Sequence, residues 1–476
     1  MAELIQDRSS GDYCLEVPFD PPNIFPELLF LSPTNPRNGA YQMVRGLLAK
    51  LELDKKNIGT DQWNPLGQII RPGNKVLIKP NLVTPKHYLG RRAAFSTIVH
   101  GSILRPIIDY AVLALRGSGS ITIADNPVES APFDELMQLT GIGQMVSELT
   151  TRGYRNLRVV DLRPKLIKES KAGKFYHSTQ AGDPQGYITI DLAENSLFHE
   201  LDGIPDIHYY TLADQTVDHF DPRYFGESAT DKYHNSRNHK YIVSGSVLDS
   251  DVIINVAKLK THCKSGVTLT LKNMIGMVYL KECMPHHRPG PPPDGDSFPF
   301  YPASHYVAAR KLYKSLREHF QIHRFPGFRV LRNLLQRKGI LIQQHLEHGN
   351  WRGNDTIWRT ILDLNRIAVY ADKNGIMRDT PQRRFLFLVD GIVGQEGNGP
   401  MSGDPVNAST LLGGFNPVAV DTLAASSMGI NPEIIPAISR ASGEMKWSLC
   451  PKNGREIKGP QPNRTIHRFR LPKGWI

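Results

Sequence analysis

Short apolar runs alternate with helical segments over much of the chain. Lys75–Lys79, Ser120–Ala124 and Leu157–Val160 have the length and apolar character of buried strands. Ser102–Leu115, between the first two runs, repeats its apolar residues with helical spacing. A strand, a helix and a second strand in succession predict a β–α–β unit with a parallel sheet and a right-handed crossover.

The same pattern returns later in the chain. Val252–Asn255 and Arg384–Val389 read as two further buried strands, and Pro417–Met428 as a helix with proline at its start. A helical segment is also expected near Ala40–Leu51, and a loop-and-hairpin excursion over residues 162–240. We therefore predict an α/β fold with a largely parallel sheet and flanking helices.

Changes in composition suggest a division of the chain. We expect an N-terminal lead-in (1–70), a discontinuous α/β core (71–283 and 360–450), a basic helical insertion or cap (284–359) and a basic C-terminal tail (451–476). A chain of 476 residues is long enough for roughly two to three domains or one large domain with insertions. No internal repeat is evident.

Basic and amide side chains gather where the predicted strands end. If the Val252 strand continues, alternation places Lys258, Lys260, His262 and Lys264 on one face. The carboxyl ends of parallel strands meet at one edge of the sheet, which is where α/β proteins usually bind ligands. The proposed catalytic residues are His262, Lys258, Lys260 and Asp125, and the proposed substrate-binding residues are Lys79, Asn81, Asn255, Lys272, Asn273, Gly397 and Gly399. For any single one of these residues a solvated surface or a turn remains the alternative.

A glycine-rich segment, Asp390–Asp404, follows the Arg384 strand. Its five glycines allow the backbone to approach a ligand closely, although it matches neither a P-loop nor a GxGxxG dinucleotide loop. Asp390, Glu396 and Asp404 offer three oxygen ligands for a divalent cation such as Mg²⁺. A long surface turn with solvated acids is the alternative.

Three histidine positions deserve separate predictions. His262 is a candidate general acid or base, because neighbouring cations would favour its neutral form; the alternative is that the cations only clamp an anion. We expect Ser102 rather than His100 to cap the helix that follows. His286 and His287 are adjacent on irregular chain, so we expect them to face solvent rather than to bind a metal.

Charge and cysteine content narrow the classes of partner. The net charge of +11 favours anionic partners, above all a small anionic metabolite. The chain has no dense run of basic residues interleaved with aromatic ones, so nucleic-acid binding is not favoured. The positive charge alone still leaves it open. The four cysteines form no CxxC pair, so we expect no iron–sulfur cluster and a reducing, cytoplasmic location. The chain has no apolar stretch of membrane-spanning length, and it is compatible with a homo-oligomer.

Several of these segments together resemble the family known as domain of unknown function 362. The matching segments are Val76–Asn81, Ile123–Pro127, Asn255–His262, Leu271–Gly276, Asp390–Pro400 and Asn416–Asp421. The family has no settled activity, so the resemblance implies a fold rather than a reaction. Some members carry ferredoxin-type cysteine clusters, which this chain lacks. The β–α–β layout is also distantly similar to the N-terminal domain of lactate racemases, and long members occur among surface-polysaccharide genes.

We therefore expect an enzyme that acts on a phosphorylated, nucleotide-sugar or carboxylate metabolite through lysine, histidine and aspartate acid–base chemistry. Isomerisation, epimerisation or elimination is the first expectation. Two alternatives remain: a metal-dependent phosphoryl hydrolase or transferase, and a non-catalytic scaffold that binds an anion or nucleic acid. The scaffold would use the basic residues of the cap, namely Arg310, Lys311, Lys314 and Arg317.

Overall fold

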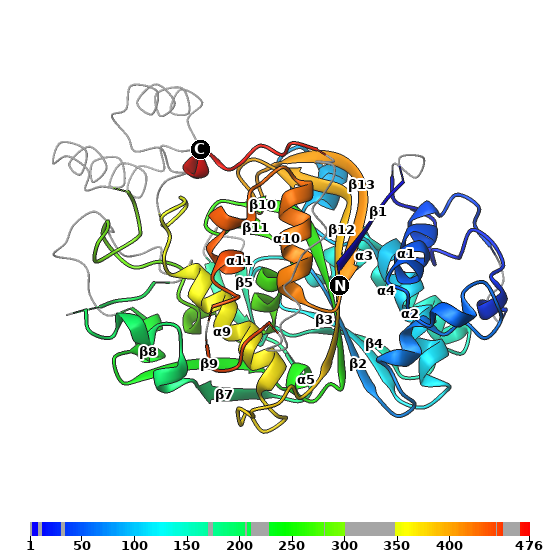
Figure 1. The fold of residues 1–476 in the computed structure, drawn as a ribbon, viewed down its shortest axis with the longest axis horizontal. Helices are drawn as coiled ribbons and strands as arrows, with labels where there is room; N and C mark the ends of the chain where they lie inside the picture. Colours follow the sequence, from blue (N-terminus) through cyan, green and yellow to red (C-terminus); the bar gives the residue numbers. More distant parts are fainter. Residues whose placement is uncertain are drawn as a thin grey trace.

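One eight-stranded sheet organises the molecule, with helices on both of its faces (Figure 1). The computed structural model describes residues 2–7, 12–29, 34–169, 175–204, 207–210, 228–279, 281–299, 348–443, 445–450 and 467–476. The strand order is β1-β13-β12-β10-β2-β3-β4, and β11 pairs with β10. β10 lies at the centre of this order. Its two neighbours, β12 and β2, come from distant parts of the chain.

Five strands of this sheet run parallel. They are β2 (Lys75–Pro80), β3 (Ser120–Asp125), β4 (Leu157–Asp161), β10 (Val252–His262) and β12 (Arg384–Glu396). Val252 aligns with Val76 on one side and with Arg384 on the other, so the three central strands begin at the same level. The predicted α/β class with a largely parallel sheet is confirmed.

The remaining strands are antiparallel and lie at or near one edge. They are β13 (Asp404–Gly414), β1 (Ala2–Gln6) and the short β11 (Gly266–Thr268). β12 and β13 form a long hairpin, so the glycine-rich segment expected as a loop contributes the ends of two strands. The expectation that residues 1–70 only lead into the core is wrong, because β1 pairs with β13 and completes the sheet.

Helices from the two halves of the chain cover opposite faces (Figure 1). One face carries α1 (Gly39–Lys50), α2 (Gly101–Leu115), α3 (Phe133–Thr140) and α4 (Ile142–Thr151), which share a core with Val76 and Val252. The other face carries α6 (Thr270–Asn273), α9 (Ile357–Tyr370), α10 (Pro417–Ser427) and α11 (Pro436–Ser439). Their apolar residues pack on Ala257 and Leu259 of β10. Because side chains alternate along β10, this strand contributes apolar residues to the cores on both faces of the sheet.

Residues 162–240 supply two small sheets in their described parts, as the expected excursion requires. A hairpin pairs β5 (Lys165–Glu169) with β6 (Phe175–Thr179). A second sheet joins β7 (Tyr187–Asp191), β9 (Asn238–Ser244) and β8 (His234–Asn235), and α5 (Gly245–Leu248) leads from β9 towards β10. Within the described ranges, none of the helices combines the length and the apolar character that crossing a membrane requires.

Two predicted parts of the chain fall largely outside the described residues. Residues 300–347, with the four basic side chains assigned to the cap, lie outside them, so the helical cap stays a prediction. The described flanks, 284–299 and 348–356, are irregular chain. Of the C-terminal tail, residues 467–476 are described, and they pack against the body through the buried side chains of Phe469 and Trp475.

Candidate anion-binding site

β10 brings its lysines to the carboxyl end of the sheet. Its eleven residues are all buried, and it extends to His262, which confirms that the strand continues through the charged stretch. Lys258 and Lys260 follow Val256 on the alternating face that packs towards α2. A register irregularity against β12 lies between these two lysines, next to Gly391. The strand thus carries two ammonium groups into a fully buried environment.

Lys258 is neutralised inside the protein. Its Nζ lies 2.9 Å from Oδ2 of Asp390 and also bonds to the hydroxyl of Tyr13. The Tyr13 hydroxyl donates to both carboxylate oxygens of Asp390, at 2.8 and 3.0 Å. Burial lowers the pKa of Lys258 while Asp390 opposes that shift, and burial together with Asp390 raises the pKa of Tyr13. The amine, the hydroxyl and the carboxylate thus bond to one another inside the protein, and the catalytic role of Lys258 stays a prediction.

His100 completes the surroundings of this ion pair. Its ring stacks on Tyr13 with centroids 4.8 Å apart, and its Nδ1 accepts a hydrogen bond from the backbone N–H of Ser102. His100 is therefore the N-cap of α2, and the expectation that Ser102 would cap the helix is wrong. Burial and the nearby Lys258 lower the pKa of His100 to about 3, so the imidazole is neutral.

A second internal ion pair lies on the other face of the sheet. Nζ of Lys79 is 2.6 Å from Oδ1 of Asp125, whose Oδ2 accepts the N–H of Leu82. Asn273 Oδ1 lies 3.4 Å from the same amine, and Asn273 Nδ2 donates to Oδ1 of Asn255 at 2.7 Å. These predicted residues do come together, but as partners of one another. Asp125 thus forms an ion pair with Lys79, and its catalytic role stays a prediction.

Lys260 differs because its partners are neutral. Its Nζ donates to Oδ1 of Asn81 at 2.7 Å and to the carbonyl of Thr97 at 2.8 Å. Burial, followed by the positive charges of Lys272 and Lys258, lowers its pKa well below the usual value. Lys260 thus links the buried ion pairs to a group of cations beyond the end of β10.

That group, which we call the basic cluster, consists of Lys264, Lys272, Lys281, His262 and His286. Burial is the main reason that the pKa of each lysine falls to about 8. Lys264 and Lys281 each lower the pKa of Lys272 further, so Lys272 has both of the other amines as neighbours. Nζ of Lys264 is buried and has no hydrogen-bond partner among the described residues. None of the three amines forms an ion pair with a carboxylate in the described part of the chain.

The two histidines of the basic cluster hold complementary neutral forms. Nδ1 of His262 accepts the backbone N–H of Lys264 at 3.1 Å, which leaves the proton on Nε2. Nδ1 of His286 faces the carbonyl of Met284 at 2.8 Å, so it carries the proton and Nε2 keeps a lone pair. Burial and nearby lysines lower both pKa values, that of His286 to about 3. One imidazole can donate to a ligand and the other can accept.

Neither His286 nor His287 faces solvent as expected, since only 5% and 1% of these residues are exposed. His286 is fixed by its own backbone, whose N–H donates to the carbonyl of Tyr210, and by its ring contact with Met284. The irregular chain that suggested exposure folds back over the end of β10. Local sequence carries no signal for this, because the covering contacts come from residues far away along the chain.

Asp421 positions the element that carries Lys272. Its carboxylate accepts the backbone N–H groups of Thr270 and Leu271 at 2.8 and 2.9 Å, and the Thr270 hydroxyl at 2.6 Å. Burial raises the pKa of Asp421 to about 7, and these hydrogen bonds oppose the shift. The second turn of α10 thus anchors the start of α6, which holds Lys272 at the basic cluster.

The glycine-rich segment borders the site but meets protein atoms. Gly399 accepts the N–H of Cys263 at 3.0 Å, and a Cβ at Gly399 would overlap the carbonyl of Thr261. Gly397, with a φ of +77°, accepts the Thr261 hydroxyl at 2.8 Å. These glycines allow the segment to lie against the end of β10. Their predicted contact with substrate stays a prediction.

The predicted three-carboxylate metal site is wrong. Asp390 is bonded to Tyr13 and Lys258, whereas Glu396 and Asp404 lie opposite each other at the far end of the β12–β13 hairpin and both bind Arg470. Glu396 lies six positions after Asp390 along the extended strand β12, too far for the two carboxylates to share one ion. In the part of the chain that the structure describes, no three histidine, cysteine or acidic side chains form a group that could hold a metal ion.

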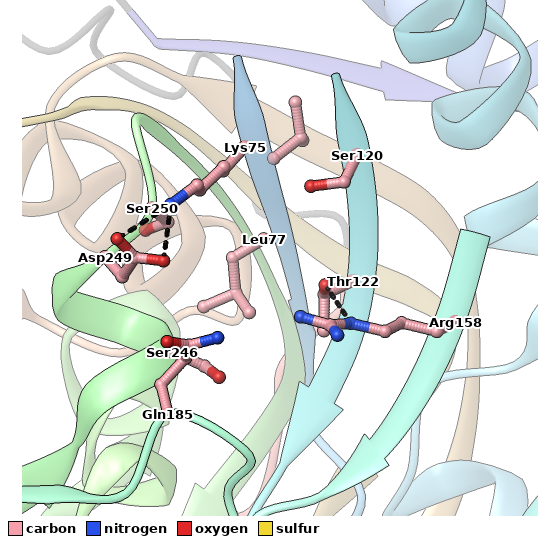
Figure 2. A pocket seen from close by; sticks show the side chains of 10 residues that line it. Lys75, Leu77, Ser120, Thr122, Arg158, Gln185, Ser246, Asp249 and Ser250 are labelled. Atoms are coloured by element: carbon pink, nitrogen blue, oxygen red, sulfur yellow. Dashed lines mark hydrogen bonds and ion pairs between the residues drawn. The ribbon is translucent and has the colours of Figure 1, made fainter. Parts of the chain in front are cut away.

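A polar hollow lies at the opposite end of the sheet (Figure 2). It lies beside the first halves of β2 and β3, where Lys75 pairs with Asp249 and the Arg158 side chain donates to Thr122 at 3.0 Å. Val76, which lines the hollow, pairs with Val252 at the beginning of β10. The hollow therefore lies at the amino ends of these strands, far from their carboxyl ends. The hollow is therefore separate from the basic cluster.

Sequence reasoning missed three residues that the structure brings to these groups. Tyr13 lay in the supposed lead-in, and nothing in its local sequence indicates a bond to Asp390. Lys281 follows the Leu271–Gly276 segment closely and might have been included as one more cation. His286 was noted only as half of a histidine pair. The structure adds the last two to the predicted His262 and Lys272.

Comparison with known proteins gives a family and no activity. The family model described as "Domain of unknown function (DUF362)" matches residues 203–426. No curated protein matches the chain. A crystal structure of a protein from Thermotoga maritima is 12% identical, with a TM-score of 0.24, over 51% of this chain and 39% of that one. The chain thus spans about two fifths of that protein, and a similarity this low supports no inference. The similarity to lactate racemases stays a prediction. The part of the chain that contains β10, α6 and the basic cluster thus matches the family of the domain of unknown function DUF362.

Proposed function

We propose that the chain is an enzyme that binds a small anionic metabolite at the basic cluster and transfers a proton by lysine and histidine chemistry. The proposal rests on one observation, the buried amine of Lys264, which is unpartnered within the described ranges. Lys264 is 3% exposed, and its Nζ has no hydrogen-bond partner among the described residues. A buried cation without a partner is costly, and an anionic ligand would remove that cost.

Lys272 and Lys281 would share the charge of the ligand with Lys264. His262 would donate a hydrogen bond from Nε2. His286 would accept a proton at Nε2, because the bound anion would raise the pKa that burial and the lysines lower to about 3. Amines with a pKa near 8 are also suited to exchange protons near neutral pH. Isomerisation, epimerisation or elimination next to the anionic group would need no more than this donor and acceptor.

The catalytic roles first expected for Lys258 and Asp125 pass to other residues in this proposal, because each of the two is held in an internal ion pair. The alternative of metal-assisted chemistry at phosphate relied on Asp390, Glu396 and Asp404 as metal ligands. Asp390 is separated from the other two, so these residues do not form one metal site. The scaffold alternative depends on Arg310, Lys311, Lys314 and Arg317, which lie outside the described residues.

Ligand binding can be tested by thermal unfolding of the full chain against phosphorylated sugars, nucleotide sugars and carboxylic acids. A ligand at one hundred times its Kd should add about 2.7 kcal/mol to the free energy of unfolding. Lys272→Gln should abolish this gain, and Lys373→Gln, which removes an exposed charge elsewhere, should keep it. Failure of every anion to stabilise the wild-type protein would contradict the proposal.

Proton transfer needs its own measurement. A stabilising ligand should gain deuterium from D₂O when incubated with the enzyme, as read by mass spectrometry. His286→Gln should remove this exchange and still allow the ligand to bind. If the wild-type protein binds the ligand without any deuterium exchange, the catalytic part of the proposal is contradicted. The protein would then only bind an anion.

A further inference from the structure

The arrangement of donors in the basic cluster points to the charge and shape of the ligand. The lysines come from three separate elements: Lys264 from the turn after β10, Lys272 from α6, and Lys281 from the 3₁₀ turn Lys281–Cys283. His262 adds an Nε2–H from the end of β10. Donors that approach from several elements surround a group rather than meet one of its edges.

The cations of the cluster are ammonium and imidazole groups. Planar carboxylates are matched best by the two-pronged guanidinium of arginine, whereas lysine acts as a point charge that also suits phosphate oxygens. Arg163, which acts on Lys281, is already held by Asp161, and Arg288 is not among the groups that act on the three amines. The free donors of the cluster therefore fit a tetrahedral oxyanion better than a planar one.

The charge balance supports a doubly charged group. Two of the acids that act on the cluster are engaged elsewhere: Asp125 holds Lys79, and Asp296 accepts the Thr356 hydroxyl at 2.6 Å and the backbone N–H of Arg288. A third acid, Glu129, raises the pKa of Lys281 but forms no ion pair with it among the described residues. Lys272 has no carboxylate among the described groups that shift its pKa, and a thiol, Cys263, is its nearest counterpart. The three amines thus have no carboxylate in an ion pair of their own among the described residues.

We propose that the ligand of the basic cluster carries a tetrahedral dianion, of the chemical class of a phosphate monoester or inorganic phosphate. The inference rests on the proposed function, whose anionic ligand it narrows to one class. Lys264, Lys272 and Lys281 bind the dianionic oxygens, and His262 donates through Nε2. A monocarboxylate leaves part of this positive charge unneutralised, so it binds more weakly.

Binding of such a group is linked to protonation. The described groups that act on the three amines, on one another or on the two histidines are Lys79, Asp125, Glu129, Arg163, His177, Lys260, His262, Cys263, Glu282, His286 and Asp296. Each of the three amines is about half protonated near pH 8, because its pKa is about 8. A dianion favours the charged amines, raises their pKa values and draws protons from solution.

Isothermal titration calorimetry of the full chain at pH 8 tests this inference with inorganic phosphate, sulfate and acetate. Sulfate is useful because it does not titrate near pH 8, so any proton taken up belongs to the protein. We expect phosphate and sulfate to bind at least about tenfold more tightly than acetate, a difference that corresponds to one unit of log Kd. Runs in two buffers of different ionisation enthalpy should show a net uptake of protons.

Matched variants tie the result to the cluster. Lys264→Gln and Lys272→Gln should each weaken phosphate binding at least about tenfold, and Lys373→Gln should leave it unchanged. Far-UV circular dichroism and thermal unfolding check that each variant is folded; if Lys264→Gln does not fold, Lys272→Gln decides, because Lys272 is only partly buried.

The possible failures separate cleanly. Acetate that binds as tightly as phosphate and sulfate would overturn the dianion class and keep the proposed anion site. Dianion binding without proton uptake, or unchanged in both lysine variants, would overturn the assignment to these amines. Absence of binding by all three anions and by the metabolites tested above would overturn the proposed function as well.

Discussion

The hydroxyl of Tyr13 donates a hydrogen bond of 2.8 Å to Asp390, a residue 377 positions later in the chain. The same carboxylate holds the buried amine of Lys258. Through this contact the N-terminal segment supports the ion pair of Lys258 and Asp390 at the centre of the sheet. The residues around β10 therefore divide into ion pairs that stabilise the fold and cations that remain available to a ligand.

Lys258→Met should be strongly destabilising, because it leaves Asp390 charged and buried without its cation. Removal of one partner of a buried ion pair costs about 3–5 kcal/mol. Tyr13→Phe removes one hydrogen bond to the same carboxylate, and its expected cost is about 1–3 kcal/mol. Urea unfolding measures both values.

The matched control is Lys75→Met. Lys75 also pairs with an aspartate, Asp249, but its side chain is 56% exposed. Loss of this surface pair should cost less than about 1 kcal/mol. Equal losses for Lys258→Met and Lys75→Met would show that burial of the Lys258 pair has no special weight.

Gly276→Ala tests the second ion pair by crowding it. A Cβ at Gly276 would overlap the carboxylate of Asp125 and the amine of Lys79, both of which are buried. Overpacking of this kind should lower the free energy of unfolding by about 1–3 kcal/mol. Gly203→Ala is the control, since no atom lies within 4 Å of its Cβ position and the residue is exposed. A neutral Gly276→Ala would mean that the Lys79–Asp125 pair can shift freely.

Local patterns were sufficient to predict the parallel core. The apolar runs at Lys75, Ser120 and Leu157 appear as strands within one residue of the predicted bounds, and the Ala40 segment appears as α1. The Arg384 run begins at the predicted residue but continues beyond Val389 to Glu396. These elements are specified by period and by breakers such as proline and glycine, which act over a few residues. The antiparallel part was not predicted. The pairing of β1 with β13 depends on residues more than four hundred positions apart, as in Ala2 opposite Gly414.

The candidate site shows the same division. Alternation along β10 correctly placed Lys258 and Lys260 on one face, and convergence at the strand ends brought Lys79 to Asp125. A sequence does not show which cations have partners, because pairing is decided in space. Lys258 and Lys79 found carboxylates in other strands, whereas Lys264 did not. The metal prediction failed for a related reason, since an extended strand separates carboxylates that lie close in sequence.

The buried lysines predict an unusual dependence of stability on pH. The pKa of Lys264 is lowered from 10.5 to about 8 in the folded protein. Between these two values the unfolded chain binds more protons than the folded one, so this group makes stability rise with pH. At pH 7 the charged, buried amine is unfavourable, and Lys264→Met should stabilise the ligand-free protein by up to about 3 kcal/mol. The gain should shrink as pH approaches 9.5, which urea unfolding across this range can measure.

Two comparisons make the pH prediction specific. Lys373→Met removes an exposed lysine, and it should give no comparable stabilisation at pH 7. Saturating phosphate should reverse the order of stability at pH 7, because the wild-type amine then has its counterion. A difference between Lys264→Met and wild type that stays constant from pH 7 to pH 9.5 would contradict a buried, titrating amine.

The C-terminal residues should control how firmly the turn with Lys264 is held. The indole N–H of Trp475 donates to the carbonyl of Cys263 at 2.7 Å, and its ring lies 2.9 Å from the Cβ position of Gly266. The segment passes over the end of the sheet where β10 and β11 lie (Figure 1). Trp475→Ala removes the hydrogen bond and a buried ring, a change that typically costs about 3–5 kcal/mol in a protein core. Because the loss is local to the turn, phosphate binding should weaken together with stability.

Hydrogen exchange distinguishes this local effect from general unfolding. In Trp475→Ala, amides between His262 and Gly266 should exchange faster, while those of β2 should keep their protection at mild denaturant concentration. Ile476→Ala is the control, because that residue is 94% exposed and should change neither exchange nor phosphate affinity. Unaltered phosphate binding in a Trp475→Ala protein whose turn does exchange faster would show that Lys264 needs no support from the C-terminal segment.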